Sequence, residues 1–187
     1  MRAPSIEVVG TIEVPLSIIE RAALILSDAL GLRATTVNRI PAPPSSTFDE
    51  RRRQYKAEAV LAWASSHRRE ERALFLLLAD VDAYVEGLNF VFGLALPRLG
   101  AAAVFLSRLK LPLEREGGLE LLIERVEKES LHEVGHLLGL GHCSRRLCVM
   151  SFSNSLAEVD AKTSRFCSSC SALLASRGII VRTSRAL

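Results

Sequence analysis

The chain has 187 residues, of which 49% are hydrophobic, and its 24 Lys and Arg nearly balance 21 Asp and Glu. This length suits one domain that buries roughly 70% of the surface of its unfolded chain. The basic residues form no long block, so no nucleic-acid partner is indicated. The longest apolar stretches are short or interrupted by Gly and Pro, so no membrane span is predicted. The sequence predicts a single domain over residues 1–187, and we expect a monomer.

The first residues do not resemble a secretory signal, because they include Glu7 and Glu13 and no continuous apolar run. We therefore expect a cytoplasmic protein. Thiols stay reduced in the cytosol, where clustered cysteines indicate metal binding more than disulfides. This matters because the chain has four cysteines and four histidines, and most of the histidines lie in one short stretch.

The first two thirds of the chain alternate between strand and helix patterns. In chain order, the expected elements are a strand over 5–14, a helix over Leu16–Leu30 that closes near Gly31, a strand over 33–40, a helix over Phe48–His67, and strands over 73–81, 88–96 and 101–109. Three arginines at 51–53 are expected on the solvated face of the second helix. The last two strands are expected to join across Pro97–Gly100. This order predicts a mixed α/β (α+β) fold with a twisted mixed sheet.

A long helix is predicted from Leu119, because apolar residues then recur at a period close to 3.6. Glu124 and Lys128 are expected as an i,i+4 ion pair on its outer face. The helix carries the sequence HEVGHLLGLGHC, residues 132–143, at its C-terminal end.

Three histidines of this stretch are spaced to meet at one ion. His132 and His136 are four residues apart, so their side chains lie one turn apart on the same helix face. Gly139 can adopt the left-handed conformation that ends a helix and turns the chain sharply. The turn would return His142 beneath the helix as a third ligand.

Three neutral imidazoles leave one position of a tetrahedral zinc ion open to water, which is typical of catalytic zinc. The metal lowers the pKa of that water toward about 7. Glu133 would accept the water's proton as the oxygen attacks a peptide carbonyl, and then pass it to the leaving amine. A HExxH pattern alone is also compatible with an ordinary helix face. The added glycine and third histidine favour zinc, and the sequence predicts hydrolysis of peptides or unfolded proteins.

The cysteines form two pairs with metal-ligand spacing. Cys143 and Cys148 follow the histidines directly, and Cys167 and Cys170 form a CxxC. Four thiolates would make a closed tetrahedral site, which is typical of structural zinc. A redox CxxC, buried thiols and disulfides are the alternatives. Because every cysteine belongs to one of the two pairs, we favour zinc, which gives two Zn²⁺ per chain.

The pattern His132-Glu133-x-x-His136-x-x-Gly139-x-x-His142 resembles that of the metzincin metallopeptidases. Metzincins also have a methionine in a tight turn below the metal, for which the segment CVMSFSNS offers Met150. With the abutting cysteine and the later CxxC, the chain resembles the archaemetzincins in particular. This resemblance implies a zinc-dependent peptidase, aminopeptidase-like in some members, with Met150 packed under the zinc.

The resemblance also implies a sheet above the active-site helix, with an antiparallel edge strand that binds the substrate. We expect that edge strand within 101–109. The N-terminal part, 1–139, would end in the active-site helix. The C-terminal half, 140–187, would hold the Met-turn, the zinc site of the four cysteines and a helix from about Thr163. The alternative function is a catalytically latent zinc-binding module that acts through a partner, but the intact Glu133 favours a peptidase.

Overall fold

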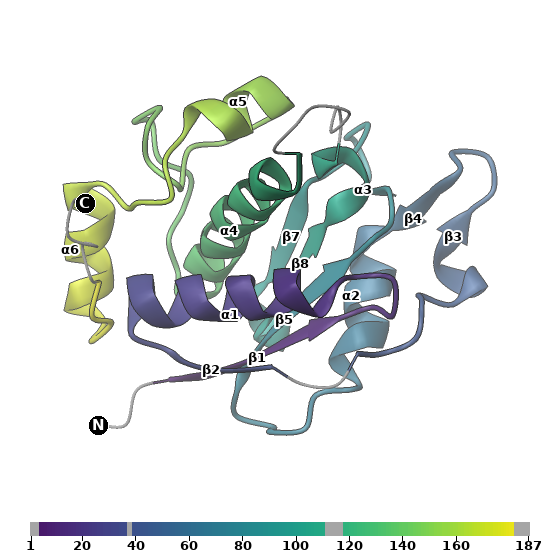
Figure 1. Cartoon of the computed structure of the whole chain (residues 1–187), viewed down its shortest axis with the longest axis horizontal. Coiled ribbons are helices and arrows are strands. Elements are labelled where there is room, and N and C mark those ends of the chain that lie inside the picture. The colour runs from purple at the N-terminus through teal and green to yellow at the C-terminus, as the bar shows by residue number, and fades with distance from the viewer. Residues whose placement is uncertain (1–3, 37–38, 111–117, 182–187) are drawn as a thin grey trace.

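A five-stranded sheet with helices on both faces organises the chain (Figure 1). The computed structural model describes residues 4–36, 39–110 and 118–181. In spatial order the strands are β2 (Arg33–Thr36), β1 (Ser5–Gly10), β5 (Leu74–Ala79), β8 (Ala101–Phe105) and β7 (Gly93–Leu96). The first four strands are parallel, and β7 pairs antiparallel with β8. The prediction of a mixed sheet is confirmed.

Helices α1 and α4 cover one face of this sheet and α2 covers the other (Figure 1). The helical elements are α1 (Leu16–Leu30), the short 3₁₀ helix η1 (Ser45–Thr47), α2 (Ala57–Ser65), the 3₁₀ helix η2 (Pro97–Leu99), α3 (Leu106–Leu109), α4 (Gly118–Leu137), α5 (Leu156–Ala161) and α6 (Ser168–Ser176). No helix among the described residues is both long and apolar enough to cross a membrane. The predicted bounds of α1 are confirmed, and its cap Gly31 is left-handed, with φ 61°.

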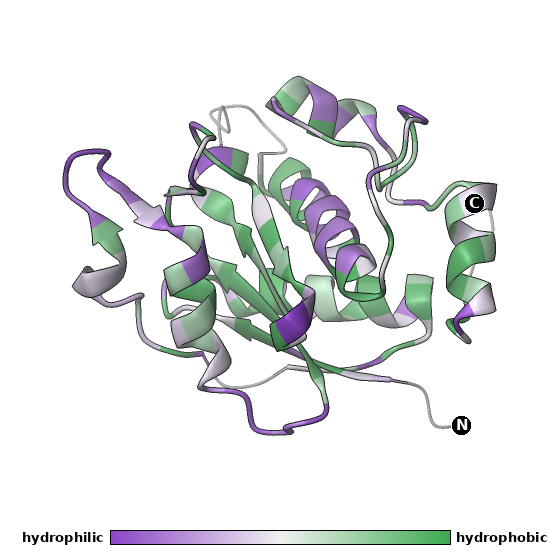
Figure 2. Ribbon diagram, turned by 180° about the vertical axis from the view of Figure 1, so that it is seen from behind, coloured by the Kyte–Doolittle hydropathy of each residue, from purple (hydrophilic) through white to green (hydrophobic). Residues whose placement is uncertain are grey.

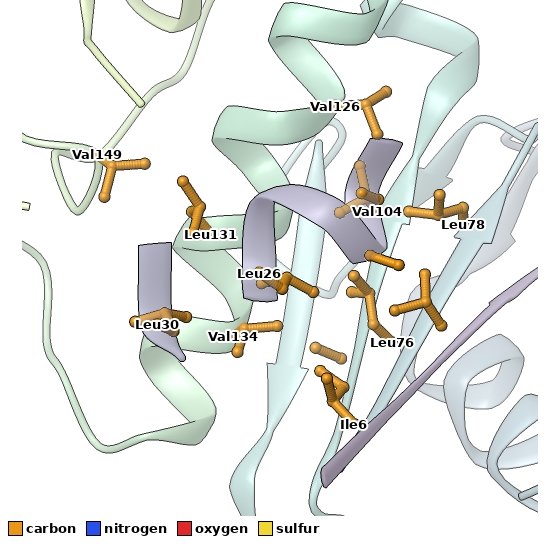
Figure 3. Close-up of a cluster of buried hydrophobic side chains, with 14 of the residues drawn as sticks. Ile6, Leu26, Leu30, Leu76, Leu78, Val104, Val126, Leu131, Val134 and Val149 are labelled. Atoms are coloured by element: carbon orange, nitrogen blue, oxygen red, sulfur yellow. The ribbon is translucent and has the colours of Figure 1, made fainter. Parts of the chain in front are cut away.

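The two faces of the sheet build two cores, because successive residues of a strand point to opposite sides. On β5, Leu76 and Leu78 face α1 and α4, whereas Phe75 and Leu77 face α2. Figure 3 shows the first core, where side chains of α1, α4 and the strands meet. Figure 2 shows the strands as largely hydrophobic, whereas hydrophilic residues lie in the turns and along α4. The larger core fixes α4, which carries the histidines, against the sheet.

The predicted helix over Phe48–His67 is wrong over residues 48–56, which contribute two strands to a second, three-stranded sheet. Its strands are β3 (Phe48–Asp49), β4 (Gln54–Lys56) and β6 (Ala83–Tyr84), and the helix begins only at Ala57. The three arginines therefore lie on the β3–β4 turn and not on a helix.

Local hydrogen bonds and a distant partner strand explain this difference. The Asp49 carboxylate accepts hydrogen bonds from the backbone N–H groups of Arg51 and Arg52, which folds the turn. Arg53 then takes a left-handed conformation with φ 54°. Tyr55 pairs with Ala83 on β6, a strand distant in sequence. Helical propensity over 48–56 is overridden by this pairing.

The edge strand is β7 and not the segment 101–109, so that expectation is wrong. β8 lies between β5 and β7, and the end of the predicted segment, from Leu106, forms α3. The two strands are joined by η2 and Gly100, as expected for 97–100, and Gly100 is left-handed with φ 58°. β7 pairs with β8 along one side and lies at the outer edge of the sheet order.

The C-terminal half contains two short helices where one from about Thr163 was expected. Ser155 caps α5 by accepting a hydrogen bond from the N–H of Glu158, and the Glu158 carboxylate accepts one from the N–H of Asn154. These bonds resemble a capping box shifted by one residue, and α5 begins at Leu156. The second helix, α6, starts after Cys167, so the expected start lies in the connection between the helices.

The expected outer-face pair of α4 is half buried. Lys128 Nζ is 2.7 Å from Glu124 Oε1, as predicted, but the Lys128 side chain is 2% exposed. Its Nζ also donates a hydrogen bond to the carbonyl of Asp160 in α5. Lys128 therefore links the two helices, which the spacing within one helix does not reveal.

Candidate metal centres and active-site cleft

Three histidines meet where α4 ends. His132 and His136 lie on consecutive turns of α4, and His142 follows a turn at Gly139, which is left-handed with φ 86°. One ring nitrogen from each histidine lies within 4.8 Å of those of the other two. The structure thus brings together the histidines that their spacing predicted to meet.

Backbone carbonyls orient two of these rings. His132 Nδ1 is 2.8 Å from the carbonyl oxygen of Val149, and His136 Nδ1 is 2.8 Å from that of Leu140. Carbonyls only accept hydrogen bonds, so both Nδ1 atoms carry protons and both Nε2 atoms carry lone pairs. These two Nε2 atoms are 3.1 Å apart. Facing lone pairs at this distance are stabilised by a shared cation, so the donor set fits zinc.

Burial and nearby charges favour the neutral form of His132 and His142, which is the form that binds metal. Burial and the nearby Lys162 ammonium lower the pKa of His132 to about 2. Burial, followed by His136 and Lys162, also lowers the pKa of His142.

Glu133 lies beside the histidines and packs closely against the backbone of β7. Its side chain is buried, and a Cβ atom added at Gly93 on the edge strand β7 would lie 2.6 Å from Glu133 Cγ. Burial and the neighbouring Glu129 carboxylate raise the pKa of Glu133 well above its ordinary value, against the opposing charge of Lys162. The glycine gives the carboxylate room between α4 and the sheet.

A buried ion pair lies one turn before Glu133. Lys162 Nζ is 2.7 Å from Glu129 Oε1, and the two side chains are 1% and 4% exposed. Lys162 Nζ also lies 3.5 Å from the carbonyl oxygen of Ser151, in the segment after Met150. The pair therefore links α4 with the chain beneath the histidines.

Met150 packs under α4 between the two helical histidines. It is fully buried, and a Cβ atom added at Gly135 would lie 3.1 Å from Met150 Cε. Gly135, between His132 and His136, thus permits the close approach of the methionine.

A cleft of about 410 Å³ opens over the histidines. Its lining comes from the segment before β7, from β7 and the start of η2, from α4 and the turn that follows it, and from the chain after Met150. The lining residues are Val85, Leu88, Phe90, Val91, Phe92, Gly93, Leu94, Ala95, Pro97, Glu129, His132, Glu133, His136, Leu140, His142, Phe152, Ser153 and Asn154. The histidines and Glu133 thus lie in a groove whose other lining residues are mostly apolar.

The four cysteines form a second cluster. Their Sγ atoms lie within 4.8 Å of one another, and all four thiols are free. Cys143 Sγ is 3.7 Å from Cys167 Sγ, and Cys148 Sγ is 3.8 Å from Cys170 Sγ. These distances exceed a disulfide bond, and four soft ligands around one point fit zinc.

The thiols differ in acidity because their surroundings differ. Burial raises the pKa values of Cys148 and Cys170. Burial has the same effect on Cys167, but the backbone N–H of Cys170 and the neighbouring thiols outweigh it and lower the pKa of Cys167 to about 7. Cys167 is the N-cap of α6, where backbone N–H groups favour a thiolate.

Backbone hydrogen bonds connect the two clusters. The N–H of Cys143, next to His142, donates to the carbonyl of Met150 over 2.8 Å. Cys148 directly precedes Val149, whose carbonyl accepts the hydrogen bond from His132. The cysteine cluster therefore holds both ends of the segment beneath the histidines.

Sequence reasoning missed Gly93 and the pair Glu129–Lys162. A glycine within an apolar strand is a signal of close backbone approach, and it could have drawn attention to Gly93. The ion pair joins α4 to a residue 33 positions later in the chain, and no local spacing marks it.

Known proteins resemble this chain over most of its length. The family model of peptidase family M54 matches residues 7–176. An archaemetzincin of Aeropyrum pernix is 48% identical over 135 residues, which are 71% of either chain. The crystal structure of an archaemetzincin from Methanopyrus kandleri matches with a TM-score of 0.81 and 38% identity, covering 93% of this chain and 94% of that one.

A zinc-dependent peptidase from Methanocorpusculum labreanum matches with a TM-score of 0.80 and 29% identity, covering 90% of this chain and 99% of that one. The fold, the histidine cluster and these matches agree. The chain therefore belongs to peptidase family M54, the archaemetzincins, and is a zinc-dependent metallopeptidase.

Proposed function

We propose that the cleft over α4 hydrolyses peptide bonds, with His132, His136 and His142 as the ligands of a catalytic zinc and Glu133 as the general base. The observation that carries this proposal is the pair of facing Nε2 atoms beside a buried carboxylate in an open cleft. The Glu133 carboxylate is buried and lines the cleft together with the histidines, as a general base for the attacking water requires.

The chemistry divides between metal and protein. Zinc held by three imidazoles supplies an activated water molecule and polarises the scissile carbonyl. Glu133 accepts the proton of the attacking water and delivers it to the leaving amine, which contributes roughly 10²- to 10⁴-fold. Gly93 and α4 hold the Glu133 carboxylate at the cleft wall. The carbonyls of Val149 and Leu140 keep the imidazoles in the tautomer that binds metal.

Edge strand β7 offers a site for the substrate backbone. It pairs with β8 along one side, and its residues Leu94 and Ala95 line the cleft. An extended peptide can add to such an edge through backbone hydrogen bonds. We propose that peptides or unfolded protein segments bind antiparallel to β7, with side chains in the apolar part of the cleft.

The second metal of the proposal is structural. Cys143, Cys148, Cys167 and Cys170 hold a closed zinc site that stabilises the C-terminal half. The chain would then bind two Zn²⁺ and act as a monomeric, single-domain enzyme in the cytosol.

The test is cleavage of a peptide library by the zinc-loaded protein, with matched peptides whose amino termini are free or acetylated. We expect two zinc ions per chain, cleavage that stops with chelator, and recovery on addition of zinc. If only peptides with free amino termini are cleaved, the protein is an aminopeptidase. If the acetylated peptides are cleaved as well, it is an endopeptidase. Two bound zinc ions without cleavage of any peptide would contradict the proposal and favour a latent module that binds a partner.

A further inference from the structure

The outer wall of the cleft is a loop between β6 and β7. We call residues 85–92 the cleft loop. Val85, Leu88 and Phe90 from this loop line the cleft with apolar side chains. Phe152, from the segment after Met150, adds a further apolar side chain to the lining.

Few of the hydrogen bonds that hold the cleft loop come from the loop itself. The N–H of Leu88 donates to the carbonyl of Val85 over 3.1 Å, and that of Val91 donates to the carbonyl of Ala83 over 2.9 Å. The Val91 bond closes the loop at its base, and the Leu88 bond closes a turn within it. They leave the carbonyls at its tip to be held from outside.

The β3–β4 hairpin supplies the missing donors. Arg52 Nη2 donates to the carbonyl of Leu88 over 2.8 Å and to that of Asn89 over 3.1 Å. Gln54, buried at 6% exposure, donates a further hydrogen bond from Nε2 to the same Asn89 carbonyl over 2.9 Å. Two side chains that lie outside the cleft therefore fix the backbone of its wall.

Arg52 is itself held in one orientation. Its Nε donates to Gln54 Oε1 over 3.2 Å, and its guanidinium carbon lies 3.8 Å from the centre of the Tyr84 ring. Tyr84 is buried, and its hydroxyl donates to Asp49 Oδ2 over 2.7 Å. The stacked guanidinium binds both carbonyls through Nη2 while its Nε binds Gln54, and a lysine ammonium lacks this second donor and the planar group that stacks on Tyr84.

A second arginine, Arg108, packs on the neighbouring residue of the loop, Phe90. The Arg108 guanidinium carbon lies 4.4 Å from the centre of the Phe90 ring, and Arg108 makes a two-pronged ion pair with Asp82 at 2.7 and 2.8 Å. A loop held by both arginines loses little conformational freedom when a peptide binds, so ordering it costs little affinity.

We propose that Arg52 is a positioning residue for substrate binding, which presets the cleft loop to receive an apolar side chain of the peptide. This inference rests on the proposed peptidase function. Arg52 touches neither the histidines nor Glu133 in any hydrogen bond or ion pair among the described residues, so its contribution falls on substrate affinity and not on the chemical step.

The test compares Arg52→Ala and Arg52→Lys with Arg51→Ala as the matched control, all as zinc-loaded full chains. Arg51 lies on the same turn and donates a hydrogen bond to Asp49 through its backbone N–H, which alanine keeps. For peptides with an apolar residue flanking the scissile bond, we expect KM to rise about tenfold in Arg52→Ala, with kcat within about twofold of wild type. Arg52→Lys should recover only part of this loss, and Arg51→Ala should match wild type.

Hydrogen exchange separates this inference from the peptidase proposal, because it needs no substrate. In Arg52→Ala the amides of Leu88 and Val91 should exchange at least about tenfold faster, while that of Phe75 in the sheet core stays unchanged. Unchanged exchange in the cleft loop would overturn the inference, as would equal KM values or a loss of kcat alone. If wild type cleaves no peptide but exchange in the loop still accelerates, the peptidase proposal fails and the bracing of the loop by Arg52 stands.

Discussion

Gly93 on the edge strand and Glu133 on α4 are in such close contact that no side chain fits between them. A Cβ atom at residue 93 would lie 2.6 Å from Glu133 Cγ. The backbone of β7 is fixed by its pairing with β8, whereas Glu133 ends in rotatable bonds. This one contact therefore sets the position of the proposed general base, Glu133, relative to β7, the strand that we propose binds the substrate.

Gly93→Ala should displace the Glu133 carboxylate and leave the histidines in place. We expect kcat to fall by about 10²-fold, within the range for loss of a general base, with zinc content unchanged. Peptide kinetics and zinc analysis of the purified variant measure this. Gly141→Ala is the control, because a Cβ atom there meets no atom within 4 Å. Full activity in Gly93→Ala would show that the close contact with residue 93 does not position Glu133.

Lys162→Met should destabilise the fold by about 3–5 kcal/mol, because it leaves the Glu129 carboxylate buried without its partner. Denaturant unfolding in zinc-saturated buffer measures the free energy of unfolding. The double variant Glu129→Met with Lys162→Met should lose less than Lys162→Met alone.

Arg33→Met is the matched control for this ion pair. Arg33 pairs with Glu70 at the surface, where the two side chains are 65% and 48% exposed, so its loss should cost less than about 1 kcal/mol. If the double variant loses as much free energy of unfolding as the two single variants together, Glu129 and Lys162 are not coupled.

Removal of the CxxC should weaken both metal sites. Cys148 leads directly into Val149, which orients His132, so Cys167→Ser with Cys170→Ser should lower Tm by about 10 °C or more and bring zinc content below one ion per chain. Ser169→Ala, between the two cysteines, is the control. Retention of one full zinc ion at the histidines would refute the proposed coupling.

The elements set by local pattern were predictable, and those set by distant pairing were not. The apolar periodicity and closing Gly31 of α1 define that helix by themselves, and α4 likewise follows its own periodicity. The histidines lie within eleven residues of one another, so helix geometry and the turn at Gly139 suffice to bring them together.

The hairpin over 48–56 depends instead on Tyr55 meeting Ala83, a partner that its own charged sequence does not specify. The choice of β7 as edge strand has the same origin. The sequences of neighbouring apolar strands do not indicate their order in a sheet. The pairing of β8 with β5 is what leaves β7 at the edge. Gly93 and Lys162 escaped prediction because their partners come from other elements.

The most direct test of the account is peptide cleavage by zinc-loaded Glu133→Gln, measured beside wild type with the zinc content of both. Glutamine keeps the shape of the side chain but cannot accept the proton. The account predicts a loss of kcat of at least about 10²-fold with two zinc ions still bound. Cleavage at the wild-type rate by this variant would contradict the role of Glu133 as the base.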